Sequence, residues 1–152
     1  MSVTETIPTT SELAARMRTI VGRMSRGVRQ AGGQTDLSPS QSEVLGTVAR
    51  RGDVRLSELA SIEGINPTLL SRIIGKLETA GLLVREADPD DRRAAHVLPT
   101  AKGRKRYEQI RSERTDALTM AIEALDEQEQ QALAAALPVL EALADSLRQR
   151  PA

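Results

Sequence analysis

The 152-residue chain has no cysteine, no tryptophan and no phenylalanine, and Tyr107 is its only tyrosine. Without cysteine, disulfides, thiol chemistry and cysteine-based metal sites are excluded. With a single aromatic ring of this kind, the chain also lacks the stacking surfaces with which single-strand and RNA binders hold bases. If the chain binds nucleic acid, the scarcity of aromatic residues favours double-stranded DNA.

Long apolar runs are also missing. No stretch approaches the roughly 18 consecutive apolar residues that span a bilayer, and the first residues lack the basic segment and apolar run of a secretory signal. We therefore expect no membrane partner and a cytoplasmic location. His96 is the only histidine, so a histidine-rich zinc site is not expected either, and we predict neither a metal nor a cofactor.

The formal net charge at pH 7 is zero, which argues against a strongly basic nucleic-acid binder. The charges are nevertheless unevenly distributed. Residues 50–106 contain twelve lysines and arginines against eight acids, whereas residues 107–152 contain four against nine. The middle of the chain is therefore the part suited to nucleic acid, and we expect the acidic C-terminal third to point away from it.

Residues 66–80 predict a helix with two contrasting sides. At about 3.6 residues per turn, one side holds the apolar residues Leu70, Ile73, Ile74, Leu77 and Ala80. The other side holds Thr68, Ser71, Arg72, Gly75 and Thr79, with Lys76 at its edge. Short hydroxyls, two cations and a residue without a side chain suit hydrogen bonding to base edges and phosphates. The pattern is typical of a recognition helix.

Both ends of this helix carry clear signals. Asn66 is a good N-cap, Pro67 suits the first helical position, and Gly81 can take the left-handed conformation that ends a helix. A short β-prone run follows at 82–85, then a polar turn at 88–93 and a return strand at 94–98. A helix followed by a charged hairpin predicts a winged helix.

Two shorter helices are expected before the recognition helix. Ser38, Pro39 and Gln41 begin the first with a capping-box pattern, and it runs to Arg51. The second covers about residues 56–63 and closes at Gly64. Together with the recognition helix, the second short helix forms a helix-turn-helix unit.

The terminal segments predict long helices with apolar stripes. One stripe recurs at steps of three and four along residues 9–31, and further helices follow Thr100 and Asp126. These stripes exceed what a small winged domain could cover, so we expect a twofold dimer with interlocked terminal helices. The predicted fold is mainly α with a small β wing: a flexible tail at 1–8, a dimerisation helix at 9–35, a winged helix-turn-helix domain at 36–103, and C-terminal dimerisation helices at 104–152.

Several segments of the chain resemble the MarR family of bacterial regulators. Its wing signature is similar to Gly81-Leu82-Leu83-Val84-Arg85, then Asp91-Arg92-Arg93, then residues 97–100 and Gly103. Residues 37–41 and 56–60 fall where that family begins the two preceding helices. Three residues depart from the pattern: Pro99 and His96 stand at usually aliphatic positions, and Ser42 stands at an often aromatic one.

This resemblance implies a homodimeric transcriptional regulator, which we expect to be a repressor, bound to a pseudo-palindromic DNA operator. Arg93 would enter the minor groove while Asp91 orients its guanidinium, and Arg92 would meet phosphate. The full set of predicted DNA-contacting residues is Ser38, Ser40, Pro67, Thr68, Ser71, Arg72, Lys76, Arg92 and Arg93.

An effector site is a further expectation from the resemblance. In MarR-like proteins, small anionic aromatic effectors often lodge between the dimer helices and the winged domain. Arg16, Arg23 and Tyr107 are the candidates here for contacting a small anionic or apolar ligand. Solvated arginines that pair with the acidic C-terminal helices are the alternative interpretation.

Other function classes fit the sequence less well than DNA binding. The acids Glu86, Asp88, Asp90 and Asp91 could suggest acid–base chemistry or a cation site. We interpret them as a turn, because no histidine base or nucleophile accompanies them and a hairpin tip is too exposed to shift a pKa. The main alternative is a winged helix that serves only as a protein-interaction scaffold, and an enzyme ranks third.

Overall fold

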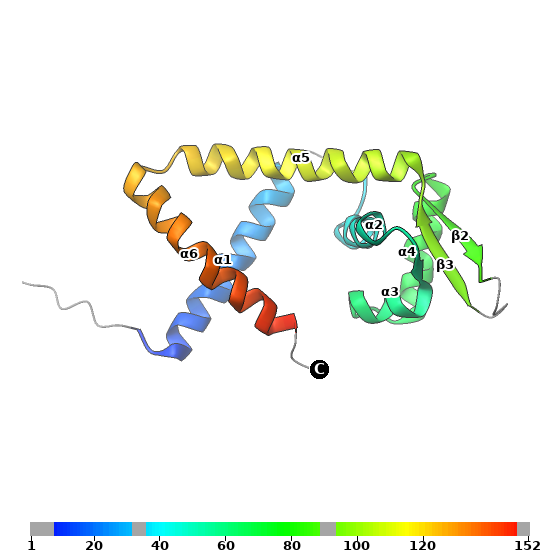
Figure 1. Cartoon of the computed structure of the whole chain (residues 1–152), viewed down its shortest axis with the longest axis horizontal. Helices are drawn as coiled ribbons and strands as arrows, with labels where there is room; N and C mark the ends of the chain where they lie inside the picture. Colours follow the sequence, from blue (N-terminus) through cyan, green and yellow to red (C-terminus); the bar gives the residue numbers. More distant parts are fainter. Residues whose placement is uncertain (1–7, 32–35, 89–93, 149–152) are drawn as a thin grey trace, which may run out of the picture. The chain divides into compact units, whose positions relative to one another are not determined.

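The computed structural model describes residues 8–31, 36–88 and 94–148, which form six helices and a three-stranded antiparallel sheet (Figure 1). The elements in chain order are α1 (Thr10–Ala31), α2 (Pro39–Arg51), β1 (Val54–Arg55), α3 (Leu56–Glu63), α4 (Pro67–Thr79), β2 (Leu83–Ala87), β3 (Ala95–Pro99), α5 (Ala101–Glu123) and α6 (Glu127–Arg148). The mainly helical fold with a small β wing confirms the predicted class. The chain divides within α5 into two compact units, one ending at Arg114 and the other beginning at Thr115.

The apolar core lies in the first unit, where α2, α3 and α4 pack with the small sheet. Its buried side chains are Val44, Leu45, Val48, Val54, Leu59, Leu70, Ile73, Ile74, Leu77, Leu82, Leu83 and Val97. Four of the five residues predicted for the apolar side of α4 are in this set. Ala80 is exposed instead. It lies beyond the last residue of α4, where the chain turns toward Gly81, so the prediction was wrong at this position.

Short-range capping determines where α2 and α4 begin. The Ser38 hydroxyl accepts a hydrogen bond from the Gln41 amide at 3.3 Å, and the Gln41 side chain accepts one from the Ser38 amide at 2.7 Å. Asn66 Oδ1 accepts from the Leu69 amide at 2.9 Å. The predicted capping box and the predicted N-cap of the recognition helix are therefore both present.

The sheet contains a strand that the sequence did not predict. β1 has only two residues, and it pairs antiparallel with β3 through Val54–Val97 and Arg55–His96. β3 is therefore the central strand, with the longer β2 on its other side. A two-residue strand has no alternation pattern, so neither periodicity nor composition could reveal it.

Pro99 ends β3 opposite Leu83 of β2. In the neighbouring pair, the Thr100 amide donates to the Leu82 carbonyl oxygen at 3.1 Å. Because hydrogen-bonded and non-hydrogen-bonded pairs alternate along an antiparallel ladder, the Leu83–Pro99 pair is a non-hydrogen-bonded one. The proline therefore costs the ladder no bond, which explains how a residue without an N–H closes this strand.

The first turn of α5 is attached to the end of α4. The Thr100 hydroxyl donates to the Gly81 carbonyl oxygen at 2.7 Å and accepts from the Gly103 amide at 2.9 Å. Lys102 Nζ donates to the Ala80 carbonyl oxygen at 2.7 Å. A Cβ on Gly103 would lie 2.0 Å from the Leu82 carbonyl oxygen, so only glycine allows this approach. Thr100 therefore caps α5 and also attaches it to the turn that follows α4.

The terminal helices expose apolar side chains in each unit. In α1 these are Leu13, Ile20, Val21 and Met24, and in α6 they are Leu137, Val139, Leu143 and Leu147. Among the helices of the described segments, none combines the length and apolar character needed to cross a membrane.

Candidate nucleic-acid interface

The polar side of α4 is open, as the periodicity predicted. Pro67, Thr68, Arg72 and Lys76 are exposed, and Ser71 is half-buried. Within the described part of the chain, the side chains of Arg72 and Lys76 form neither an ion pair nor a hydrogen bond. An arginine and a lysine one turn apart with no internal partner are available to phosphates and base edges.

Gly75 lies between these two cations in chain order. A Cβ on Gly75 would meet no atom within 4 Å. The backbone of α4 is therefore open at this point, and another molecule could approach it closely. Thr79 differs from the other hydroxyl residues of this side, because its hydroxyl donates to the Gly75 carbonyl oxygen at 2.9 Å and is thus already used.

The start of α2 holds the two serines predicted to contact DNA. Ser38 and Ser40 are both exposed. The Ser38 hydroxyl oxygen caps the helix, which leaves its proton free to donate to another acceptor. The unpaired amides of a helix N-terminus favour an anion such as phosphate.

The predicted wing-tip residues Asp91, Arg92 and Arg93 lie outside the described residues, so their roles stay predictions. The base of the wing is described, and its centre is Asp88, whose side chain is 3% exposed. Asp88 Oδ2 lies 2.7 Å from Arg55 Nη2 and 3.0 Å from His96 Nε2. Asp88 thus joins the hairpin to the residue that precedes α3.

His96 connects this carboxylate to a second one. Its Nδ1 lies 2.6 Å from Asp53 Oδ1 in the loop before β1. The hydrogen bond with Asp53, followed by that with Asp88, raises the pKa of His96 above its ordinary value. Only the imidazolium form can donate from both ring nitrogens at once, which is the physical cause of this direction.

One interpretation from the sequence needs correction at this place. The sequence predicts that the hairpin acids are too exposed to shift a pKa, yet Asp88 is buried and faces a histidine whose pKa is raised. His96 lies in β3 and also joins two acids from different loops, a role that the sequence did not predict. The partners lie 43 and 8 residues away in the chain, so no local pattern could reveal them. Within the described residues, no group of three or more acids and histidines could hold a metal ion.

Arg85 of β2 also belongs to the candidate interface, although no separate role was predicted for it. Its Nη2 donates to the carbonyl oxygen of Ser71 at 2.8 Å and contacts the Ser71 hydroxyl at 3.3 Å. Its Nε lies 3.1 Å from Glu78 Oε2 as an ion pair, and its backbone amide donates to Glu78 Oε1 at 3.1 Å. One wing residue therefore contacts two turns of the recognition helix.

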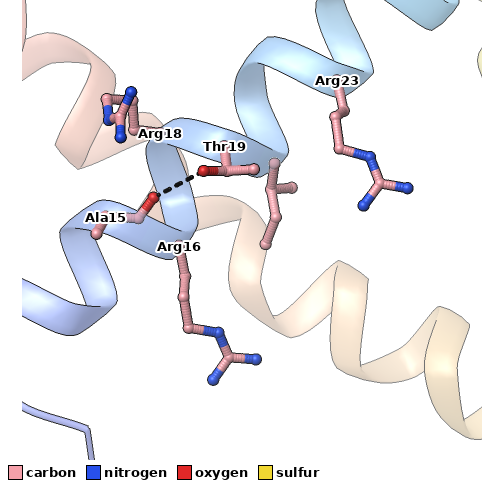
Figure 2. A pocket seen from close by; sticks show the side chains of 6 residues that line it. Ala15, Arg16, Arg18, Thr19 and Arg23 are labelled. Carbon is pink, nitrogen blue, oxygen red and sulfur yellow. Dashed lines mark hydrogen bonds between the residues drawn. The ribbon is translucent and has the colours of Figure 1, made fainter.

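The candidate effector residues do not gather in one cavity of the described chain. Arg16 and Arg23 line an open hollow of about 500 Å³ on α1 together with Arg18, Thr19 and Ile20 (Figure 2). Tyr107 of α5 is not among the lining residues and packs against the core of the first unit.

Tyr107 has its own partners there. Its hydroxyl lies 3.3 Å from Arg50 Nη1, and the Arg50 guanidinium lies 5.8 Å from the centre of its ring. The second Arg50 nitrogen, Nη2, donates to the Thr47 hydroxyl at 3.2 Å. These contacts between α2 and α5 give Tyr107 a structural role that needs no bound ligand.

A helix-turn-helix whose second helix presents unpaired cations, followed by a β hairpin, defines a winged-helix DNA-binding protein. Residues 35–94 match the MarR family. An uncharacterized HTH-type transcriptional regulator of Mycobacterium bovis is 28% identical over 135 residues, which cover 89% of this chain and 94% of that protein.

Solved structures agree with this match. A candidate transcriptional regulator of Pseudomonas aeruginosa has 37% sequence identity and a TM-score of 0.79, covering 88% of this chain and 95% of that one. FabT of Streptococcus pneumoniae, solved in complex with DNA, has 18% identity and a TM-score of 0.67, with 91% and 99% covered, and shows the shared fold. The chain belongs to the MarR family, and it is a DNA-binding transcriptional regulator rather than an enzyme.

Proposed function

We propose that this regulator is a cytoplasmic repressor that binds a pseudo-palindromic operator as a homodimer. The observation that carries the proposal is the open polar side of α4, where Arg72 and Lys76 have no partner within the described residues. In this proposal α4 lies in the major groove, where arginine can bind guanine O6 and N7 as a bidentate donor. The wing tip, with Arg93, lies in the adjacent minor groove.

The homodimer is supported by the apolar side chains that the terminal helices expose. Val21 of α1 is 55% exposed, and Leu147 of α6 is 62% exposed. Contiguous apolar stripes on long helices are costly to leave in water, and a second copy of the same chain covers them symmetrically. Twofold symmetry would also present two copies of α4, as a pseudo-palindromic operator requires.

Release by an effector is the last part of the proposal. The hollow on α1 is lined by the cations Arg16 and Arg23 (Figure 2) and by the apolar Ile20. Such a lining suits a small anionic ligand with an apolar body. A ligand bound there would release DNA by favouring a dimer in which the spacing of the two α4 helices no longer matches the operator.

Salt dependence gives the test of DNA binding. Operators are first selected from a random duplex library with the wild-type protein, and affinity is then measured across a range of salt concentrations. A dimer that neutralises about four phosphates or more gives a log–log slope of about −3 or steeper. A shallow slope and no enriched sequence would instead support the protein-interaction scaffold and contradict the proposal.

A further inference from the structure

We propose that Arg85 is a positioning residue for DNA recognition: it orients the hydroxyl of Ser71 so that this hydroxyl donates its proton to an acceptor on DNA. The proposal rests on the proposed function of α4 in the major groove. Arg85 lies in the wing and its side chain contacts Ser71 and Glu78 of α4. This wing residue would therefore affect base preference without touching DNA itself.

The geometry places Arg85 across two turns of the recognition helix. Ser71 and Glu78 are seven residues apart, so they share one face of α4 with about 10 Å of rise between their backbones. The guanidinium reaches both: Nη2 contacts the carbonyl and hydroxyl oxygens of Ser71, and Nε lies beside the Glu78 carboxylate. The side chains of Arg85 and Glu78 are 31% and 33% exposed, so water competes only partly for this pair.

The Ser71 hydroxyl is thereby held differently from the hydroxyls of Thr79 on the same helix and of Thr19 on α1. Thr79 donates its hydroxyl proton to the carbonyl oxygen four residues earlier at 2.9 Å, and Thr19 does the same at 3.1 Å. This back-bond is the usual arrangement for a hydroxyl inside a helix. Within the described residues Ser71 has no such bond, and its oxygen instead accepts from the Arg85 cation.

The Arg85 contact fixes the direction of the Ser71 hydroxyl proton on the DNA-facing side of α4. A hydroxyl has one proton, and a cation beside the oxygen turns that proton away from itself. Ser71 would then meet DNA as a donor, which matches guanine O6 and N7, adenine N7 or thymine O4 in the major groove. Base edges that present only a donor, such as cytosine N4, would be disfavoured at that position.

An arginine-to-lysine substitution separates this role from a purely structural one. Lysine carries a single ammonium group, which can pair with Glu78 but cannot also hold Ser71 as the two-pronged guanidinium does. Arg85→Lys should therefore keep the fold and lose the orientation of the hydroxyl. The matched control is Arg111→Lys, which alters another arginine in an ion pair, 3.3 Å from Glu108 on α5.

The experiment measures the affinities of wild type, Arg85→Lys, Ser71→Ala and the double variant for the selected operator and all its single-base changes. Both single variants should relax preference at the same base pair of each half-site by about 2- to 10-fold, the size of one hydrogen bond. The double variant should be no worse than Ser71→Ala alone, and Arg111→Lys should match wild type. Thermal melting checks that each variant folds, and Arg85→Gln replaces Arg85→Lys if the latter does not melt cooperatively.

Two outcomes overturn the inference while leaving the proposed function intact. One is an Arg85 variant that keeps full preference at the base pair relaxed by Ser71→Ala. The other is a Ser71→Ala protein that relaxes no position at all. A wild-type protein that selects no sequence from the library would instead contradict the proposed function itself, so the two failures are distinguishable.

Discussion

The imidazole Nδ1 of His96 lies 2.6 Å from Oδ1 of Asp53, which joins the central strand of the wing to the loop that follows α2. The opposite ring nitrogen faces Asp88, which also holds Arg55. Among the described residues, the charged groups near the imidazole include these two carboxylates, the Arg55 guanidinium and Glu86, which pairs with His96 across β2 and β3. The network connects β3, the hairpin loop and the start of α3, so the protonation of one histidine affects the attachment of the wing.

The first prediction concerns pH. Because the two carboxylates raise the pKa of His96 in the folded protein, its contribution to stability is fully present below the unfolded value of about 6.5. That contribution is lost as the pH rises through the higher folded pKa. The difference in Tm between wild type and His96→Val should therefore be largest in mildly acidic buffer and shrink toward alkaline pH. Asp53→Asn, which removes one carboxylate, should show a weaker pH dependence, and parallel Tm curves for all three proteins would contradict the assignment.

The second prediction concerns the joint between α4 and α5. Gly103→Ala places a methyl group where the Leu82 carbonyl oxygen lies, so α5 must shift away from the end of the recognition helix. We expect a loss of about 2 kcal/mol or more in the free energy of unfolding, measured by urea denaturation. Gly75→Ala is the control in the same domain: its Cβ meets open space, and removing a helical glycine should stabilise the fold by about 0.5–1 kcal/mol. Equal stability of the two variants would contradict the packing described.

The third prediction concerns the homodimer. Analytical ultracentrifugation at micromolar concentration should show a dimer, and Leu143→Asp should abolish it, because a charge at a twofold interface is introduced twice. Leu143 is 44% exposed in the single chain. Ala134→Asp adds the same charge on the opposite side of α6, by helical periodicity, and should remain dimeric. A stable folded wild-type monomer would contradict the prediction.

Sequence patterns predicted the local features of this fold and missed the long-range ones. The caps at Ser38 and Asn66 were predictable because their partners lie three residues away. The apolar side of α4 followed from periodicity, except at Ala80, where the helix ends. Arg85 and His96 could not be predicted, because their partners become neighbours only when the sheet packs against the helices.

The fourth prediction concerns Arg93, which lies outside the described residues and follows from the sequence alone. A narrow, electronegative minor groove attracts a guanidinium with little regard to base identity. Arg93→Ala should weaken every operator by a similar factor, corresponding to about 1–3 kcal/mol per contact. Affinities across the single-base operator panel provide the measurement, and a variant that binds as tightly as wild type would rule out this role.

The most direct test of the central claim, that the open side of α4 recognises base sequence, is the affinity of Arg72→Ala across the same operator panel. Arg72 is exposed and has no partner in the described chain, so its removal should leave the Tm nearly unchanged. We predict a loss of about 1–3 kcal/mol per half-site together with relaxed preference at one or two base positions. An even loss across all sequences with no relaxed position, or no loss at all, would contradict the assignment of α4 as the recognition helix.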